Sequence, residues 1–388
     1  MLLSDFHALD TAALPSPCYV IDETVIQRNL NILHEVGERS GARVLAALKA
    51  FSMWSLAPLY RDRLWGTCAS GLHEARLGAE FYAGEVHVYS AAFRADDLDE
   101  LLTFADHVIF NSCSQWRRFR ERCLAAKTAR PQIEFGLRIN PQHSEGATPI
   151  YDPCAPGSRL GIPEEELSAE ALAGISGLHF HTLCEQSFEA LSRTVAAVEK
   201  RFARWLPHMS WVNFGGGHQI TDPDYDIDGL VALVQDFSSR HGCQVYLEPG
   251  EAVAIGSGVL MTEVLDVMQS GMHHAILDCS ATCHMPDTLE MPYRAEISDA
   301  DLPGVLAHTY RLGGLTCLAG DVMGDYSFAE PLYVGQRLLF EDMSHYTMVK
   351  TTTFNGTRLP AIAIWNSDTR DLRVVKTFDY ADFRERLS

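Results

Sequence analysis

Short runs rich in β-branched and aromatic residues alternate with amphipathic segments over residues 43–248. Eight runs occur, at 43–49, 65–70, 86–90, 107–111, 133–139, 175–181, 211–214 and 244–248. Between them, apolar residues recur at helical spacing in segments 71–83, 94–105, 114–126, 185–206 and 226–240. Strands and helices that alternate in this way build a parallel sheet covered by helices. Eight such units predict an α/β fold with a closed (β/α)8 TIM barrel.

After about residue 258 the pattern changes to strand followed by strand. The runs are "VLMTEVLDVM", "HHAILDC", "QRLLFED", "LPAIAIW" and "LRVVKTF". They predict an all-β carboxyl-terminal domain, a sandwich or barrel, and the strand-like "SPCYVID" at 16–22 is expected to join it. We therefore expect a barrel over 23–258 and a β domain built from 1–22 and 259–388. The long polar segment 141–166 is a candidate lid.

Composition limits the classes of function. The 388 residues carry a formal net charge of −20 at pH 7, which disfavours nucleic-acid phosphates and attracts cationic ligands, or serves solubility alone. No run approaches the roughly 18 apolar residues of a membrane span, and the amino terminus lacks a basic, signal-like start. The ten cysteines form no CxxC pair. We expect a cytoplasmic protein with reduced thiols.

Reactive residue types stand at the carboxyl ends of the predicted strands, where barrel active sites are built. Lys49 ends the first run, His181 the sixth and Glu248 the eighth, and glycines 215–217 follow the seventh. The topology predicts that these residues converge on one face of the barrel.

Lys49 closes the apolar run "VLAALKAFSMW". Burial disfavours an ammonium group and frees the amine to attack a carbonyl and form a Schiff base; the alternative is a snorkelling or ion-paired lysine. Glu248 of "YLEPGE" is suited to hold a pyridinium nitrogen protonated, which makes such a ring an electron sink. Its alternative is a pair with a lysine or arginine of the barrel.

Gly215, Gly216 and Gly217 lack Cβ atoms, so their N–H groups can approach a phosphate, although such a triplet can also be a simple turn. His179 and His181 lie two apart and face one side of a strand. They are either a metal pair or, for His181, an imidazole stacked on an aromatic cofactor. No convincing further ligands stand at strand ends, so we favour stacking, a structural role for His179 and no metal.

Cys317 lies in the glycine-rich loop "GLTCLAGDVMGDY". A thiol there can act as a general acid if it is placed over the reacting carbon. The alternative is an ordinary buried cysteine.

Together these motifs resemble the fold-type III, pyridoxal-phosphate-dependent decarboxylases, the alanine-racemase-like group that includes ornithine and diaminopimelate decarboxylases. Within the group, the chain is most similar to the carboxynorspermidine (carboxyspermidine) decarboxylases. The motifs extend over nearly the whole chain: "ALKAFS", "GTCASGLHEARLG", "YSAAF", "VIFNS", "SRLG", "FHTLCE", "GGGHQIT", "YLEPGEA", "HMPDTLEMPY", "CLAGDVMGDY", "YTMVKTTTFNG" and "DFRERLS".

The resemblance implies roles for the strand-end residues. Lys49 would hold pyridoxal 5'-phosphate covalently, His181 would stack on its ring, and Glu248 would contact its pyridine nitrogen. Glycines 215–217 and Tyr346 of "HYTMVK" would hold its phosphate.

Cys317 matches a cysteine that, in the relatives, crosses from the neighbouring subunit and acts at the substrate α-carbon. The resemblance therefore implies a homodimer with shared active sites. Cys184 stands where the ornithine enzymes carry a serine near the phosphate, which leaves the role of this position open.

The motif "EPGE" separates this chain from the ornithine and diaminopimelate enzymes, which usually carry arginine where Glu251 stands. Glu251 and Asp287 of "HMPD" match carboxylates that are thought to receive the amines of a long cationic substrate, and Asp321 is expected to join them. The implied reaction is decarboxylation of carboxynorspermidine or carboxyspermidine to norspermidine or spermidine, a step of polyamine biosynthesis. Three alternatives remain: a diaminopimelate- or ornithine-type decarboxylase, a non-catalytic pyridoxal-phosphate carrier, and a metal-dependent barrel hydrolase.

Overall fold

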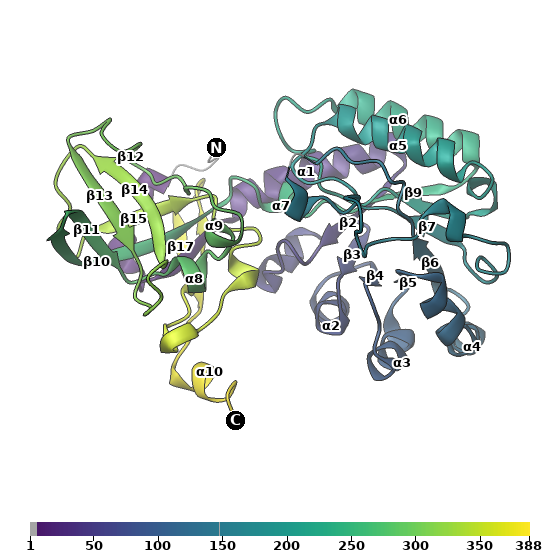
Figure 1. The fold of residues 1–388 in the computed structure, drawn as a ribbon, viewed down its shortest axis with the longest axis horizontal. Helices are drawn as coiled ribbons and strands as arrows, with labels where there is room; N and C mark the ends of the chain where they lie inside the picture. Colours follow the sequence, from purple (N-terminus) through teal and green to yellow (C-terminus); the bar gives the residue numbers. More distant parts are fainter. Residues whose placement is uncertain (1–5, 147) are drawn as a thin grey trace. The chain divides into compact units, whose positions relative to one another are not determined.

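The computed structural model describes residues 6–146 and 148–388. The chain divides into two compact units, residues 28–253 and residues 1–27 with 254–388. In the first unit, the parallel strands β2 to β9 pair in sequence and β9 returns to β2, which closes the predicted eight-stranded barrel (Figure 1).

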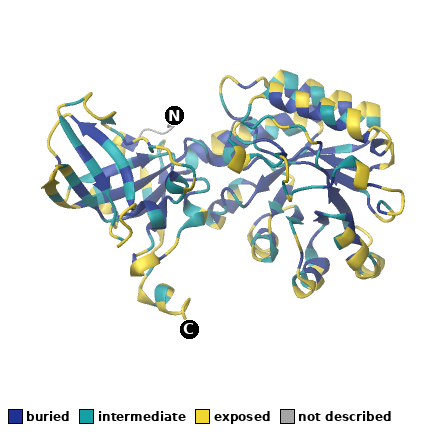
Figure 2. Cartoon of the chain, viewed as in Figure 1, coloured by how far each residue is buried: buried dark blue, intermediate teal, exposed yellow. Residues whose placement is uncertain are grey.

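The barrel strands are short and their connecting helices lie outside them (Figure 1). The strands are β2 Arg43–Ala47, β3 Gly66–Ala69, β4 Glu85–Ser90, β5 His107–Phe110, β6 Glu134–Arg138, β7 Gly177–His179, β8 Trp211–Asn213 and β9 Gln244–Leu247. The helices of this part of the chain are α1 Glu23–Ser40, α2 Leu72–Phe81, α3 Ala95–Phe104, α4 Cys113–Ala129, α5 Phe188–Phe202, α6 Ile227–His241 and α7 Glu251–Ala254. Figure 2 shows the expected amphipathic pattern, with buried strands and helices exposed on their outer faces.

Local sequence signals set the helix ends. Asp226 caps α6 by accepting a hydrogen bond from the Gly229 N–H at 2.8 Å, and Gly242 ends the same helix in a left-handed conformation, with φ of 65°. Ser112 caps α4 in the same way, with the Gln115 N–H as donor.

An indole fills the middle of the barrel. Trp211 packs with Leu45, Ile109 and Tyr246 in a cluster of inward-facing side chains. A Cβ atom on Gly177 would lie 2.0 Å from the Trp211 ring. Glycine is therefore required there because any larger residue would overlap the ring.

The second unit is built on a nine-stranded, mostly antiparallel sheet in the order β12-β14-β13-β11-β10-β1-β16-β17, with β15 also paired to β10. Its strands are β1 Cys18–Asp22, β10 Gly258–Ser270, β11 Met272–Leu277, β12 Ala300–Asp301, β13 His308–Gly313, β14 Val322–Phe328, β15 Arg337–Glu341, β16 Ala361–Asn366 and β17 Asp371–Lys376. Its α-helices are α8 Ala281–His284, α9 Asp287–Glu290 and α10 Tyr380–Arg384. Because β1 pairs with both β10 and β16, the amino-terminal segment belongs to this sheet.

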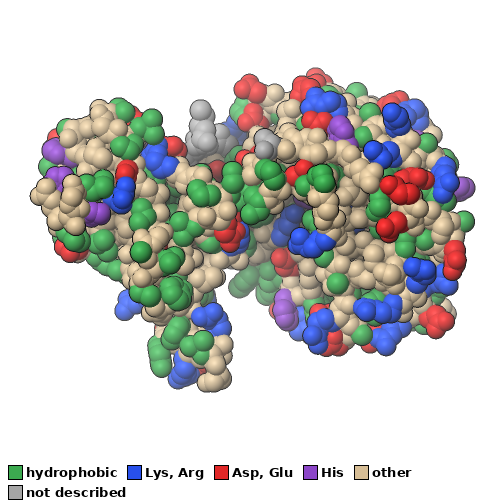
Figure 3. All heavy atoms as spheres, viewed as in Figure 1, with side chains coloured by type: hydrophobic (Ala, Val, Ile, Leu, Met, Phe, Trp, Pro, Cys, Tyr) green, Lys and Arg blue, Asp and Glu red, His purple; other side chains and the backbone are tan. Residues whose placement is uncertain are grey.

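Short 3-10 helices complete the fold. They are η1 Phe6–Ala8, η2 Thr11–Ala13, η3 Trp54–Leu59, η4 Pro149–Tyr151, η5 Glu164–Glu166, η6 Leu206–His208, η7 Met348–Lys350 and η8 Phe354–Gly356. Within the described ranges, every helix is too short or too polar to cross a membrane. All ten cysteines are free thiols. On the face seen in Figure 3, acidic and basic side chains are interspersed over the barrel unit.

The carboxyl-terminal part of the candidate lid, 141–166, is hydrogen-bonded to the barrel. The Asn111 amide donates to the Arg159 carbonyl at 2.8 Å and accepts from the Gly161 N–H at 2.7 Å. Residue 147 of this segment lies outside the described residues. Movement of the segment stays a prediction.

Candidate active site

A pocket opens at the carboxyl ends of the barrel strands. Its lining residues all come from the barrel unit: Lys49, Cys68, Ala69, Ser70, Tyr89, Arg138, His179, His181 and Glu248. The structure thus brings Lys49, His181 and Glu248 together, as their places at strand ends predicted. The strands end slightly earlier than the sequence pattern indicated: β2 ends at Ala47, β7 at His179 and β9 at Leu247, so these three side chains belong to the loops that follow.

The two ring nitrogens of His181 fix the protonation state of Lys49. His181 Nδ1 accepts a hydrogen bond from the Gly216 N–H at 2.9 Å and therefore carries no proton. His181 Nε2, which lies 3.3 Å from Lys49 Nζ, must then carry the imidazole proton and donate it. An ammonium group has no lone pair to accept it. Lys49 is therefore a neutral amine in this arrangement.

The electrostatic surroundings agree with this assignment. Burial lowers the pKa of Lys49, and the Arg138 charge acts in the same direction against Cys68 and Glu248. Burial is the main cause that holds the pKa of His181 well below its usual range, and the Arg138 charge acts in the same direction. A buried neutral lysine amine is a nucleophile suited to a carbonyl carbon.

Glu248 is held as a carboxylate by two donors. The Asn213 amide donates to Oε1 at 2.7 Å, and His179 Nε2 lies 3.2 Å from Oε2. The Glu248 side chain is 11% exposed. Burial raises the pKa of Glu248 and these two hydrogen bonds lower it, and both oxygens act as acceptors, as in a carboxylate. The pocket therefore holds an anion opposite a neutral amine.

The triple glycine has hydrogen-bond partners within the protein. The Gly215 N–H donates to Asn213 Oδ1 at 2.8 Å and the Gly216 N–H to His181 Nδ1, so both already have acceptors within the protein. Phosphate binding by Gly215, Gly216 and Gly217 stays a prediction. A Cβ atom on Gly217, where φ is 84°, would lie 1.9 Å from the Leu183 carbonyl oxygen, so only glycine fits.

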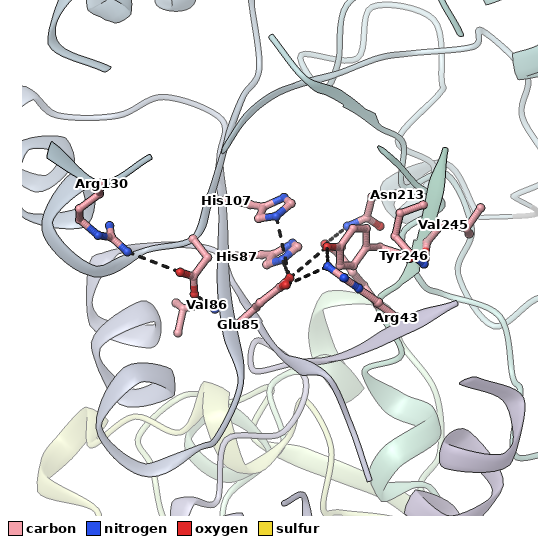
Figure 4. Close-up of polar contacts among 12 residues, drawn as sticks. Arg43, Glu85, Val86, His87, His107, Arg130, Asn213, Val245 and Tyr246 are labelled. Carbon is pink, nitrogen blue, oxygen red and sulfur yellow. Dashed lines mark hydrogen bonds and ion pairs between the residues drawn. The ribbon is translucent and has the colours of Figure 1, made fainter. Parts of the chain in front are cut away.

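Histidine geometry argues against the metal alternatives. His179 and His181 do not share a ligand: Nε2 of His179 faces Glu248, and both nitrogens of His181 have other partners. Glu85, His87 and His107 gather at the amino-terminal end of the barrel (Figure 4). There the two imidazoles stack with a 9° interplanar angle and centroids 3.8 Å apart. In-plane lone pairs of parallel rings do not converge on one ion.

The remaining predicted residues, Cys317, Tyr346, Asp287 and Glu251, have separate settings. Cys317 is exposed, and its N–H donates to Asn355 Oδ1 at 2.8 Å. Tyr346 has a positive φ of 53°. Asp287 lies 2.5 Å from Lys350 Nζ, so its carboxylate already has a cationic partner. Glu251 is the first residue of α7 and belongs to the barrel unit.

Asp321 lies in a buried, polar setting. It is 4% exposed. Its two oxygens accept hydrogen bonds from the Ser280 hydroxyl, the Thr282 N–H, and the N–H and hydroxyl of Thr316. Because these donors surround both oxygens, Asp321 fixes the loop that carries Cys317, and its contact with substrate stays a prediction.

Sequence reasoning missed several polar side chains of the pocket. Arg138 is 5% exposed, donates to the His181 carbonyl at 2.8 Å and lies 4.7 Å from the centroid of the Tyr89 ring. Within the described chain it has no ion-pair partner, which leaves a cation suited to an anionic ligand. Arg138 and Asn213 are the last residues of β6 and β8, so strand-end position was the signal that would have found them.

Comparison with known proteins identifies the family. Residues 18–344 match the family described as "Pyridoxal-dependent decarboxylase, C-terminal sheet domain". The chain belongs to this family. It is 45% identical to the carboxyaminopropylagmatine decarboxylase of Synechocystis sp., over 97% of this chain and 96% of the relative. It is 40% identical to the carboxynorspermidine/carboxyspermidine decarboxylase of Campylobacter jejuni, over 96% of this chain and 98% of that relative.

A solved structure supports the same assignment. The crystal structure of carboxynorspermidine decarboxylase complexed with norspermidine, from Campylobacter jejuni, has a TM-score of 0.88 and 39% identity. The structural match covers 96% of this decarboxylase and 100% of the chain in that crystal structure. This chain is therefore an enzyme, a carboxy-lyase that uses pyridoxal 5'-phosphate.

The residues of the pocket fit that cofactor. Lys49 offers a neutral amine to an aldehyde, and Glu248 offers an ionised carboxylate to a ring N–H. Arg138 adds a buried positive charge that suits the anionic cofactor. The glycine turn admits no Cβ atom at Gly215, where the Phe180 carbonyl oxygen would lie 2.4 Å away.

Proposed function

We propose that this decarboxylase converts carboxynorspermidine or carboxyspermidine to norspermidine or spermidine, in the cytoplasm. The observation that carries the reaction type is the neutral amine of Lys49 beside the carboxylate of Glu248 in one pocket. The relatives from Campylobacter jejuni and Herminiimonas arsenicoxydans, named for this reaction and 40% and 38% identical, support the substrate.

Bound pyridoxal phosphate supplies an electron sink for the pair left when the substrate carboxylate departs as carbon dioxide. Lys49 would hold the cofactor through its aldehyde, and Glu248 would accept a hydrogen bond from a protonated ring nitrogen. Gly216 fixes the orientation of the His181 imidazole through its N–H, so the ring is preorganised for stacking. Either Cys317 or Lys49 returns a proton to the α-carbon.

Carboxylates select a cationic substrate in this proposal. Glu251 and Asp287 bind the remote ammonium groups, and this distant binding energy orients the reacting centre. In the structure, the Lys350 ammonium group forms an ion pair with Asp287 and a second one, at 2.6 Å, with Glu290. Lys350 thus marks a place where two carboxylates already receive an ammonium group, and a substrate amine would share or displace it.

A second candidate substrate ends in a guanidinium group. The relative from Synechocystis sp. is named for carboxyaminopropylagmatine and is 45% identical. Anionic residues that bind ammonium also bind guanidinium, so the residues named above do not separate the two.

A substrate panel separates these candidates. Purified enzyme loaded with pyridoxal phosphate is incubated with carboxynorspermidine, carboxyspermidine, carboxyaminopropylagmatine, diaminopimelate and ornithine, and released carbon dioxide is measured. We expect the highest kcat/KM for the first two. Preference for carboxyaminopropylagmatine would establish the second candidate, and preference for diaminopimelate or ornithine would overturn both.

We also propose a homodimer with shared active sites. Cys317 is exposed on its own unit, together with Leu315 and Leu318, which are 48% and 47% exposed. Apolar residues around a reactive thiol suit a surface that a second copy covers. Sedimentation analysis that found only monomers in the active preparation would contradict this.

A further inference from the structure

Glu248 has two hydrogen-bond donors of different kinds. The Asn213 amide is a permanent donor, because an amide does not titrate near neutral pH. The His179 imidazole, 3.2 Å from Oε2, donates either as a neutral ring or as an imidazolium. The two forms have opposite effects on the charge that Glu248 offers to a ligand.

Hydrogen-bond accounting selects the neutral form of His179. Its Nε2 must carry a proton to donate to Glu248. Its Nδ1 is buried and has no partner among the described residues, and the side chain is 2% exposed. A proton on Nδ1 would be a buried donor without an acceptor, which costs more than a buried lone pair.

The surroundings of His179 also favour its neutral form. Arg138 on β6 disfavours a further positive charge, Lys49 after β2 is neutral in this arrangement, and Tyr89 on β4 packs its ring 5.7 Å from the imidazole. Glu248, which follows β9, is a carboxylate that favours it. Burial has the largest influence and lowers the pKa of His179.

We propose that His179 is a positioning residue that holds Glu248 by a neutral N–H donor, fixing the carboxylate without neutralising it. The full negative charge of Glu248 then remains available to the pyridine nitrogen of the cofactor. An imidazolium at His179 would partly neutralise the Glu248 carboxylate and weaken its attraction for the proton on the pyridine nitrogen. The inference depends on the family's cofactor but not on the substrate proposed above.

Three variants test the proposal on protein loaded with pyridoxal phosphate alone. His179→Gln keeps a neutral N–H donor, His179→Leu removes it, and His107→Gln replaces another buried barrel histidine that has no contact with Glu248 among those described. The readouts are the cofactor dissociation constant and the 15N chemical shift of the ring nitrogen in 15N-labelled cofactor.

The expected results distinguish a neutral donor from other roles. His179→Leu should bind the cofactor about tenfold more weakly, the usual effect of losing one hydrogen bond to a charged group, and should shift the ring nitrogen toward its unprotonated value. His179→Gln and His107→Gln should stay close to the wild type. The proposal is overturned if His179→Leu matches the wild type, or if His179→Gln fails as badly as His179→Leu.

A measurement on the unmodified protein covers the case in which His179→Leu does not fold. In 15N-histidine-labelled apoenzyme, His179 should show a neutral ring protonated at Nε2 at pH 7. An imidazolium signal, or a proton on Nδ1, would overturn the proposal.

Discussion

Replacing Glu85 by glutamine should destabilise the barrel in a pH-dependent way. Glu85 lies 2.9 Å from His87 Nε2 and 3.0 Å from Arg43 Nη1, and it accepts from the Tyr246 hydroxyl at 3.1 Å (Figure 4). Burial raises the pKa of Glu85. The hydrogen bonds of His87 and Trp65, with the charge of Arg43, outweigh burial and hold the pKa at about 2, against an ordinary value of 4.5.

This difference sets the magnitude and the sign of the effect. At 1.36 kcal/mol per pKa unit, the ionised Glu85 stabilises the fold by about 3 kcal/mol at neutral pH. Because its pKa is depressed in the folded state, this stability is present above pH 4.5 and is lost as the pH falls toward 2. Linkage predicts a loss of about 1 kcal/mol by pH 4 and about 2 kcal/mol by pH 3.

Urea unfolding followed by circular dichroism at pH 7 and pH 4 measures the effect. We expect Glu85→Gln to be about 3 kcal/mol less stable than the wild type at pH 7, with a gap about 1 kcal/mol smaller at pH 4. Asp99→Asn is the control, because its ion pair with Arg122 is exposed and should contribute less than about 1 kcal/mol at either pH. A gap that does not change with pH, or no gap at all, would refute the reasoning.

Three further predictions concern the barrel, the substrate and the assembly. Gly177→Ala should lower the free energy of unfolding by about 3 kcal/mol, because its Cβ atom would overlap Trp211; thermal unfolding checks this. Glu251→Gln should raise KM for the preferred polyamine several-fold and lower kcat less, and steady-state kinetics with unchanged KM would count against the substrate assignment. Lys49→Ala and Cys317→Ala should each be nearly inactive, yet their mixture should recover about a quarter of wild-type activity through mixed dimers, whereas no recovery would exclude shared sites.

Sequence patterns were sufficient for the barrel and for the residues at its strand ends. Alternating apolar runs fix which segments are strands, and a parallel closed sheet places all their carboxyl ends on one face. Lys49, His181 and Glu248 therefore meet in one pocket although they are far apart in sequence. Their identities, together with that geometry, indicated carbonyl chemistry with a pyridine ring.

Sequence patterns do not predict hydrogen-bond partners that only folding brings together. Asp321 stands in a motif that suggested a ligand contact, and the motif does not reveal that Ser280, 41 residues earlier, donates a hydrogen bond to its carboxylate. The sequence likewise does not reveal that the Gly216 N–H donates to the ring of His181, 35 residues earlier. Arg138 ends an apolar strand, where periodicity indicates burial but does not reveal that a guanidinium faces the pocket.

The direct test of the central claim is the chemical identity of the residue that binds the cofactor. Enzyme loaded with pyridoxal phosphate is reduced with borohydride, digested and analysed by mass spectrometry. The neutral amine in the barrel mouth predicts a single modified residue, Lys49, and no modification in Lys49→Ala. A stable adduct on another lysine, or none on Lys49, would contradict the account.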